Sequence, residues 1–174
     1  MHRRVIERGQ KVPSFIIKKM EKEEIRSLVE AFIRGTDQFL VDIKLSPSRL
    51  AVFLDKPTGI TLEECAALNH HLSAELETTG FLEKHELEVS SPGMDMPLVV
   101  MQQYLRRIGK ELKVILKDGK EAKGILQSAG ESDFEMLTVT ETKELKKKIR
   151  TEAVQKFAYS DVRETKLIFN FKLK

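Results

Sequence analysis

Tryptophan is absent from this chain of 174 residues, and cysteine occurs once, as Cys65. One cysteine cannot form an internal disulfide framework, so the sequence indicates a reducing compartment, and we expect a cytoplasmic protein. No run of about 18 apolar residues occurs, and we therefore expect no membrane-spanning helix. The basic N-terminus also lacks a continuous apolar stretch followed by a small-residue cleavage site, which argues against a secretory signal.

Constellations of residues that carry catalysis are scarce too. Ser91 is followed by Pro92 and lacks the preceding glycine of a nucleophile elbow. His70 and His71 are adjacent on a predicted helix, where successive side chains diverge by roughly 100°, so they cannot share a metal ion. No pair of cysteines and no His-x-x-x-His spacing occurs. We therefore expect a protein that is not an enzyme and that holds neither a metal nor another cofactor.

Charge is plentiful and unevenly distributed, although the net charge of the chain is +3. Residues 20–98 contain seven Lys or Arg against fifteen Asp or Glu, whereas residues 99–174 contain seventeen against eleven. An acidic half followed by a basic half indicates two modules that face different partners. The acidic charge either confers solubility alone or attracts a basic protein by electrostatic complementarity.

Residues 1–19 carry six basic residues and one acidic residue, with little periodicity. We interpret this segment as a poorly ordered basic arm or as a mis-assigned start, since Met20 opens a well-patterned acidic helix. The alternative is an arm that binds nucleic acid by releasing counterions from phosphate.

Apolar periodicity in residues 20–97 predicts the order helix, strand, strand, helix, strand. A stripe over 25–33 predicts the first helix, and the spacing of Thr61 and Glu64 predicts a capped second helix that ends before Gly80. The predicted strands are 39–45, 50–55 and 87–91. The residues of the second helix that we expect to face inward are Leu62, Cys65, Ala66, Leu72 and Leu76. This order predicts a two-layer α+β domain with both helices on one face of the sheet.

Residues 98–174 are dominated by strand patterns after one short helix. The apolar residues of that helix are Leu98, Met101, Leu105 and Ile108. The predicted strands are 112–116, the segment after Lys120, 134–139, 153–157 and 166–171. Asp118 and Gly119 predict a two-residue hairpin turn of a primed type, and Gly124 predicts a sharp bend inside the return strand. A short helix and about five bent strands are typical of a small open barrel.

Two groups of basic residues in 98–174 are candidates for contact with phosphate. The first group, near the start of the barrel, is Arg106, Arg107 and Lys110. The second group, in the segment 143–150 between two strands, includes Lys146, Lys147, Lys148 and Arg150. That segment is either a solvated, mobile loop or a surface that grips nucleic acid. If about 4 phosphates were engaged, affinity would fall by roughly two decades between 50 and 200 mM salt.

The connector between the two halves is a candidate for a second role. Its residues of interest are Ser91, Pro92, Gly93, Asp95 and Pro97. Proline fixes φ and glycine supplies backbone angles that other residues avoid, so the segment is expected to hold the two halves at a set angle. The alternative is that the segment also contacts a partner directly.

The stretch from Leu87 to Leu98 resembles the signature of the ribosome maturation factor RimP family. That signature is a similar Leu-Glu-Val-Ser-Ser-Pro-Gly segment followed by Leu-Asp-Arg-Pro-Leu, and Met96 stands here in place of its arginine. Three further segments are similar to the family: 40–43, 60–66 and 104–114. The similarity spans about residues 20–174.

The resemblance implies an N-terminal α/β domain over 20–97 and a C-terminal Sm-like β-barrel over 98–174. It also implies a non-enzymatic factor for maturation of the small (30S) ribosomal subunit. The implied partners are the immature small subunit, a basic small-subunit ribosomal protein near the decoding region, and ribosomal RNA. We expect a monomer without a membrane partner. Two alternatives remain open: a general Sm-like RNA-binding regulator, which would assemble into a ring, and a protein-interaction adaptor.

Overall fold

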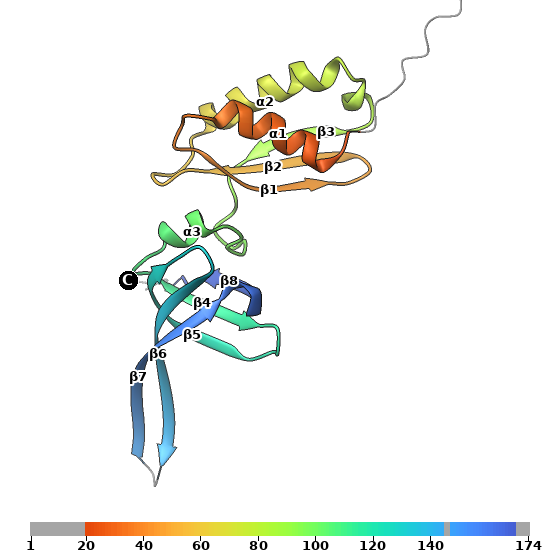
Figure 1. Cartoon of the computed structure of the whole chain (residues 1–174). Helices are drawn as coiled ribbons and strands as arrows, with labels where there is room; N and C mark the ends of the chain where they lie inside the picture. The colour runs from red at the N-terminus through yellow and green to blue at the C-terminus, as the bar shows by residue number, and fades with distance from the viewer. Residues whose placement is uncertain (1–19, 145–146, 170–174) are drawn as a thin grey trace, which may run out of the picture.

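The computed structural model of the chain describes residues 20–144 and 147–169, with side chains from 140 to 150 left undescribed (Figure 1). The predicted arm at 1–19 therefore lies outside the described residues. The described part is a mixed α+β fold with two separate sheets, as the fold class predicted. Each sheet has its own cluster of buried apolar side chains.

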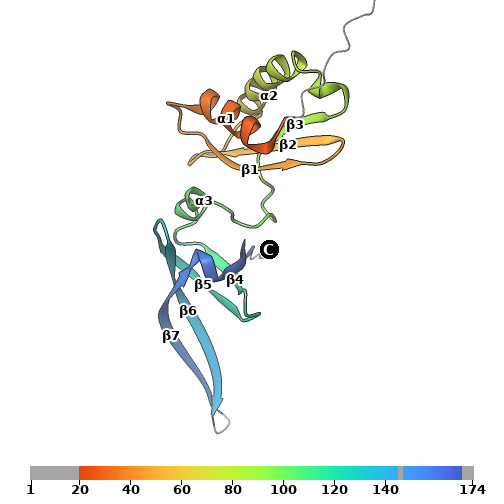
Figure 2. The same ribbon diagram turned by 45° about the vertical axis from the view of Figure 1, so that its right-hand side comes forward.

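The first module consists of three strands and two helices. Its strands are β1 (Phe39–Leu45), β2 (Arg49–Asp55) and β3 (Glu86–Ser90), in the order β1-β2-β3. Strand β2 pairs antiparallel with β1 and parallel with β3. The helices α1 (Lys22–Ile33) and α2 (Leu62–Glu77) lie on one face of this sheet, and a short 3-10 helix, η1 (Phe81–Glu83), precedes β3 (Figures 1 and 2). The observed order is the one that the sequence predicts.

Helix α2 begins where its capping residues place it. The Glu64 N–H donates to Thr61 Oγ1 at 3.3 Å, and the Thr61 N–H donates to Glu64 Oε2 at 2.8 Å. These reciprocal bonds satisfy two backbone donors that a helix start otherwise leaves unpaired.

The inward face of α2 differs from the prediction at two positions. Cys65, Leu68, Leu72 and Leu76 are buried, whereas Ala66 is exposed and Leu62 is 82% exposed. The buried residues follow the helical spacing of three and four, and Ala66 lies about 100° around the helix from Cys65. Leu62 is the first helical residue and lies largely in solvent.

The second module follows a short helix. It contains α3 (Met101–Leu105), β4 (Glu111–Leu116), β5 (Glu121–Ala129), β6 (Asp133–Glu144), β7 (Lys147–Ala158), the 3-10 helix η2 (Tyr159–Asp161) and β8 (Val162–Leu167). The strand order is β7-β6-β5-β4-β8, and all neighbours are antiparallel. Among the described residues β7 and β8 remain the two edges of an open sheet. A closed barrel is therefore not found, and the Sm-like detail of the predicted fold is not confirmed.

Helix α3 contacts the second core through a residue that the apolar pattern did not select. Tyr104 is 3% exposed and its ring lies 4.8 Å from that of Phe134, whereas Leu105 and Ile108 are 44% and 47% exposed. The helix ends at Leu105, so the predicted stripe to Ile108 is not continued.

The hairpin between β4 and β5 has a different turn from the predicted one. The Gly119 N–H donates to the Leu116 carbonyl at 3.0 Å, which makes Lys117 and Asp118 the central residues. Gly119 follows them with φ +89°, as in the three-residue hairpin loop that ends in a left-handed glycine. The predicted primed two-residue turn is therefore wrong.

Strands β6 and β7 are longer than predicted and correct the expectation of a loop at 143–150. Strand β6 pairs with β5 only from Phe134 to Thr138 but continues to pair with β7 as far as Glu144. Beyond Thr138 the two strands form a two-stranded ribbon that projects from the sheet (Figures 1 and 2). Strand β8 also begins earlier than predicted, because Val162 already pairs with Leu116 of β4, and Phe171 lies outside the described residues.

Candidate binding surfaces at the junction of the two modules

The connector runs from the end of β3 to α3 and is fastened to the second module. The Met96 N–H donates to the Gly93 carbonyl at 3.0 Å, which closes a turn. The Leu98 N–H then donates to the carbonyl of Thr165 in β8 at 2.8 Å. Ser91, Gly93 and Asp95 are exposed, while Pro92 and Pro97 are half-buried.

Gly93 does not have the role in the connector that its type suggested. It is not among the glycines with positive φ, so the expectation of unusual backbone angles at this position is wrong. A Cβ atom on Gly93 would lie 2.7 Å from Asp95 Oδ1, which is the end of a side chain that can move. The turn in the connector therefore forms through its hydrogen bonds and prolines rather than through unusual backbone angles at Gly93.

Gln103, which was not among the residues predicted from the sequence, secures the far end of the connector. Its Oε1 accepts the N–H groups of Val99 at 2.7 Å and Val100 at 3.2 Å, and the residue is 5% exposed. A glutamine three residues after the N-cap of a helix is typical of a capping box, and this spacing is a sequence signal from which Gln103 could have been predicted. On the same helix, burial raises the pKa of Tyr104 to about 12, and Thr165 acts in the opposite direction.

An ion pair joins the two modules directly. Nη1 of Arg106, just after α3, lies 2.6 Å from each carboxylate oxygen of Asp55 at the end of β2. The Asp55 side chain is 6% exposed and that of Arg106 is 27% exposed. Arg106, which we predicted to contact phosphate, is thus already occupied by a buried carboxylate. Asp55 was not among the residues predicted from the sequence, because its partner Arg106 lies 51 residues away in the chain.

The loop after Asp55 leaves room for the guanidinium group. Gly59 has φ +93°, and a Cβ atom there would lie 3.0 Å from Arg106 Nη2. The loop is held by Lys56, whose Nζ lies 2.7 Å from Glu64 Oε1. The hydrogen bond from Lys56, with those from Thr61, lowers the pKa of Glu64 to about 2.

The other two predicted basic residues near α3 have different surroundings. Arg107 is half-buried, and its Nε has no hydrogen-bond partner. Burial, and secondarily the charge of Arg106, lowers the pKa of Arg107. Lys110 is exposed. Within this group Lys110 is therefore the cation that solvent reaches most freely.

The second predicted basic group is on the projecting ribbon. Lys147, Lys148 and Arg150 belong to β7, where they pair in register with Glu144, Lys143 and Glu141 of β6. Lys146 lies outside the described residues. The end of the ribbon points away from α3 (Figure 1), so the structure does not bring the two basic groups together.

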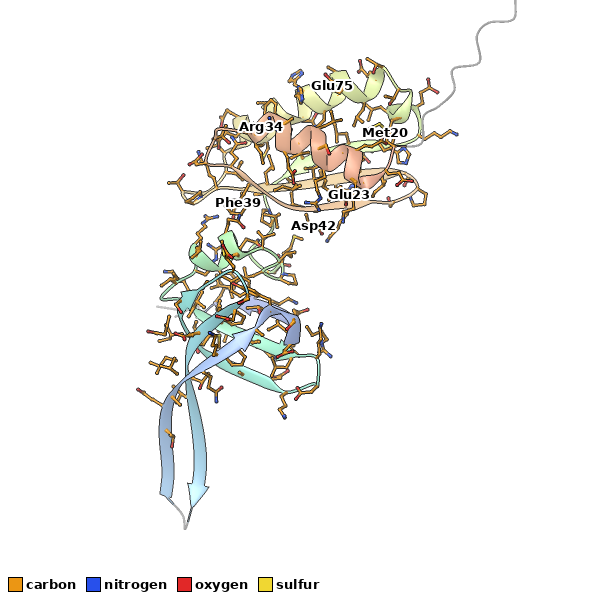
Figure 3. All side chains as sticks on the ribbon, viewed as in Figure 1. Met20, Glu23, Arg34, Phe39, Asp42 and Glu75 are labelled. Carbon is orange, nitrogen blue, oxygen red and sulfur yellow. The ribbon has the colours of Figure 1, made fainter. Side chains whose placement is uncertain are left out.

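The acidic charge of the first module lies mainly on its helical layer. Glu23 and Glu30 of α1, and Glu63, Glu75 and Glu77 of α2, are exposed. Figure 3 shows Glu75 on the helical layer and Phe39 and Asp42 on the strand nearer to α3. Acids on both sides of this module are paired with cations: Asp42 with Lys22 and Glu88 with Arg49 on the sheet, and Glu64 with Lys56 and Glu23 and Glu30 with Arg26 on the helices. The two helices nevertheless carry seven acidic residues against two basic ones, whereas the three strands carry four against two. The helical layer is therefore the more strongly anionic side.

Within residues 20–144 and 147–169, no group of three or more His, Cys, Asp and Glu side chains could hold a metal ion. No helix in the same residues has the length and apolar character needed to cross a bilayer. Two cores, a fastened connector and an ion pair across the junction define a two-module α+β protein.

Comparisons with known proteins identify the family. The sequence model of the RimP N-terminal domain matches residues 28–95. A ribosome maturation factor RimP from Cytophaga hutchinsonii is 33% identical over 163 residues, which cover 86% of this chain and 96% of the relative. One from Porphyromonas gingivalis is 35% identical over 108 residues, which cover 62% of this chain and 70% of that relative. The chain belongs to the ribosome maturation factor RimP family.

Proposed function

We propose that this chain is a non-enzymatic, cytoplasmic factor that binds the immature small (30S) ribosomal subunit and assists its maturation. The observation that carries the proposal is similarity along nearly the whole length of a ribosome maturation factor, with 96% of the Cytophaga relative covered. Similarity confined to one module would support a shared fold of that module, but it would say less about the function of the whole chain.

The two modules are proposed to make different contacts. The anionic helical layer of the first module suits a basic small-subunit ribosomal protein near the decoding region, by electrostatic complementarity. The second module is proposed to contact ribosomal RNA through Lys110 and the ribbon residues Lys146, Lys147, Lys148 and Arg150. Phosphate contacts of this kind fix position without reading base sequence. Arg106 and Arg107 are less available, because one is paired with Asp55 and the other is half-buried.

We also propose the division of the chain into domains at residues 20–97 and 98–174. The two separate cores support this division. The second domain is proposed to be Sm-like, since a short helix precedes five antiparallel strands, as the family resemblance implies. The exposed connector residues Ser91, Gly93 and Asp95, with Pro92 and Pro97 beside them, are proposed as a partner contact.

Co-sedimentation with purified immature small subunits tests the function. We expect the chain to sediment with the subunits at low salt and to be released as salt increases. A chain that stays in the supernatant at low salt would refute the proposal. Analytical ultracentrifugation of the free chain supplies the control, since we expect a monomer, whereas a ring-forming Sm-like regulator would sediment as a much larger particle.

The salt dependence tests the ribbon separately. Replacing Lys147, Lys148 and Arg150 with glutamine should flatten the slope of log affinity against log salt by about 2–3 units, since each lost phosphate contact removes roughly 0.7–0.9. The matched control replaces three exposed lysines elsewhere: Lys84, Lys117 and Lys120. An equal change of slope in both triple variants would show a general charge effect and no specific contact by the ribbon.

A further inference from the structure

The two modules meet without a shared core. The pairs of elements that pack closely lie within one module or within the other: α1 and α2 against their sheet, α3 against β5. Among residues 20–144 and 147–169, no ion pair other than Asp55–Arg106 joins the modules. The relative placement of the modules therefore depends on the connector and on this pair.

The surroundings of the pair show that the modules are loosely packed beside it. A cavity of about 380 Å³ lies next to Arg106, with walls from both modules that include Phe39, Pro57 and Leu105. Leu105 remains 44% exposed at this junction. Because close packing rather than proximity gives an interface its rigidity, these side chains do not fix one orientation.

The pair itself has the geometry of a specific contact. One guanidinium nitrogen reaches both carboxylate oxygens at 2.6 Å, and the carboxylate is almost completely withdrawn from solvent. A charged group in that position is stable only with its partner, because an isolated buried charge is strongly unfavourable. The absence of a side chain at Gly59 leaves a space for the guanidinium group, and a Cβ atom at this position would narrow that space.

We propose that the Asp55–Arg106 pair is a latch that holds the two sheets in one relative orientation. With the latch closed, the connector and the ion pair form two attachments between the modules, and two attachments suppress rotation. With the latch open, the connector alone remains, and the modules reorient about residues 91–97. Arg106 is thus a positioning residue. The latch does not depend on which molecule the modules bind.

Residual dipolar couplings measured by NMR test the latch directly, because they report the orientation of each sheet separately. In the native chain, one alignment tensor should fit the backbone amides of both sheets. Asp55→Asn and Arg106→Gln should each abolish the common tensor, while the couplings of each sheet still fit that sheet's own geometry. Lys110→Gln removes the same charge from an exposed residue of the same module and should keep the common tensor.

Three results would overturn the latch. The first is a native chain whose two sheets already need different tensors. The second is a common tensor that survives in both Asp55→Asn and Arg106→Gln. The third is an equal loss of the common tensor in Lys110→Gln, which would show a general effect of charge. These couplings are measured without any ribosomal component. The latch can therefore be refuted while the proposed function stands, and the proposed function can be refuted while the latch stands.

Discussion

Replacing Gly124 with alanine should force β5 away from β6. Gly124 is buried and pairs in register with Thr138. A Cβ atom there would lie 2.3 Å from the carbonyl oxygen of Leu137, 2.9 Å from its carbonyl carbon and 3.0 Å from Thr138 Cα. All three are backbone atoms, so no side-chain rotation can relieve the contact. The two strands must separate locally.

The cost follows from this geometry. Overpacking an ordered interior typically costs about 1–3 kcal/mol, and we place this change near the upper value because the obstacle is backbone. Alanine offsets about 0.4–1 kcal/mol by restricting the unfolded chain. The free energy of unfolding of the second module should therefore fall by about 2 kcal/mol, which lowers the Tm by about 10 °C for a module of this size.

Tyrosine fluorescence during urea unfolding is a selective assay for this change. The chain has no tryptophan and two tyrosines, Tyr104 and Tyr159, both in the second module. Gly130→Ala is the matched control: Gly130 is exposed, has no positive φ, and its Cβ would lie 3.4 Å from the nearest atom, the Asp133 carbonyl oxygen. If Gly124→Ala and Gly130→Ala unfold at the same urea concentration, the reasoning from close backbone approach is refuted.

Three further predictions concern the first core and the titration of Tyr104 and Glu64. Leu68→Ala should lower the free energy of unfolding of the first module by about 2–5 kcal/mol, because the Leu68 side chain is fully buried. Leu62→Ala should lower it by less than about 0.5 kcal/mol, because Leu62 is 82% exposed. Similar denaturation midpoints for the two variants would contradict the assignment of the buried face of α2. Burial raises the pKa of Tyr104 to about 12 from its ordinary value of 10.0, so the stability that its neutral form contributes is complete below pH 10 and is lost as the pH rises through 12. The absorbance of tyrosinate should show this late ionisation, and a native Tyr104 that ionises at its ordinary pH would refute it. The pKa of Glu64 is lowered to about 2 from 4.5, so the stability that its carboxylate contributes is present above pH 4.5 and disappears as the pH falls towards 2. Glu64→Gln should therefore weaken the dependence of stability on pH in this window, which circular dichroism can measure. An unchanged dependence on acid would show that the bonds to Lys56 and Thr61 have no net effect on stability.

Local signals in the sequence were sufficient for most of the first module. Thr61 and Glu64 marked the start of α2 because a capping box involves residues three apart and needs no knowledge of the fold. Alternation similarly located β1 and β2. Leu62 was wrongly predicted to face inward, because apolar periodicity gives the direction of a side chain but does not show whether a neighbouring element extends far enough to cover it.

Long-range pairing explains what the sequence did not show. Residues 143–150 were predicted to be a segment that joins two strands, either a solvated loop or a surface for nucleic acid, yet β6 and β7 pair with each other as far as Glu144. Arg106 was predicted to contact phosphate because it belongs to a basic group, but the geometry of a guanidinium group suits carboxylate as well as phosphate. Its partner is 51 residues away in the chain, and no local pattern identifies Asp55. Gly93 was misjudged for a different reason, since residue type indicates which backbone angles are allowed and not which are used.

Crosslinking of the chain to immature small ribosomal subunits, read at single-residue level, tests the central claim most directly. We expect crosslinks from the helical layer, at residues such as Glu63 and Glu75, to a basic small-subunit protein. Crosslinks from Lys110 and the ribbon residues Lys147 and Lys148 should go to RNA. Crosslinks to the same molecule from both modules, or none above the level seen with mature subunits, would contradict the assignment of two surfaces to two kinds of partner.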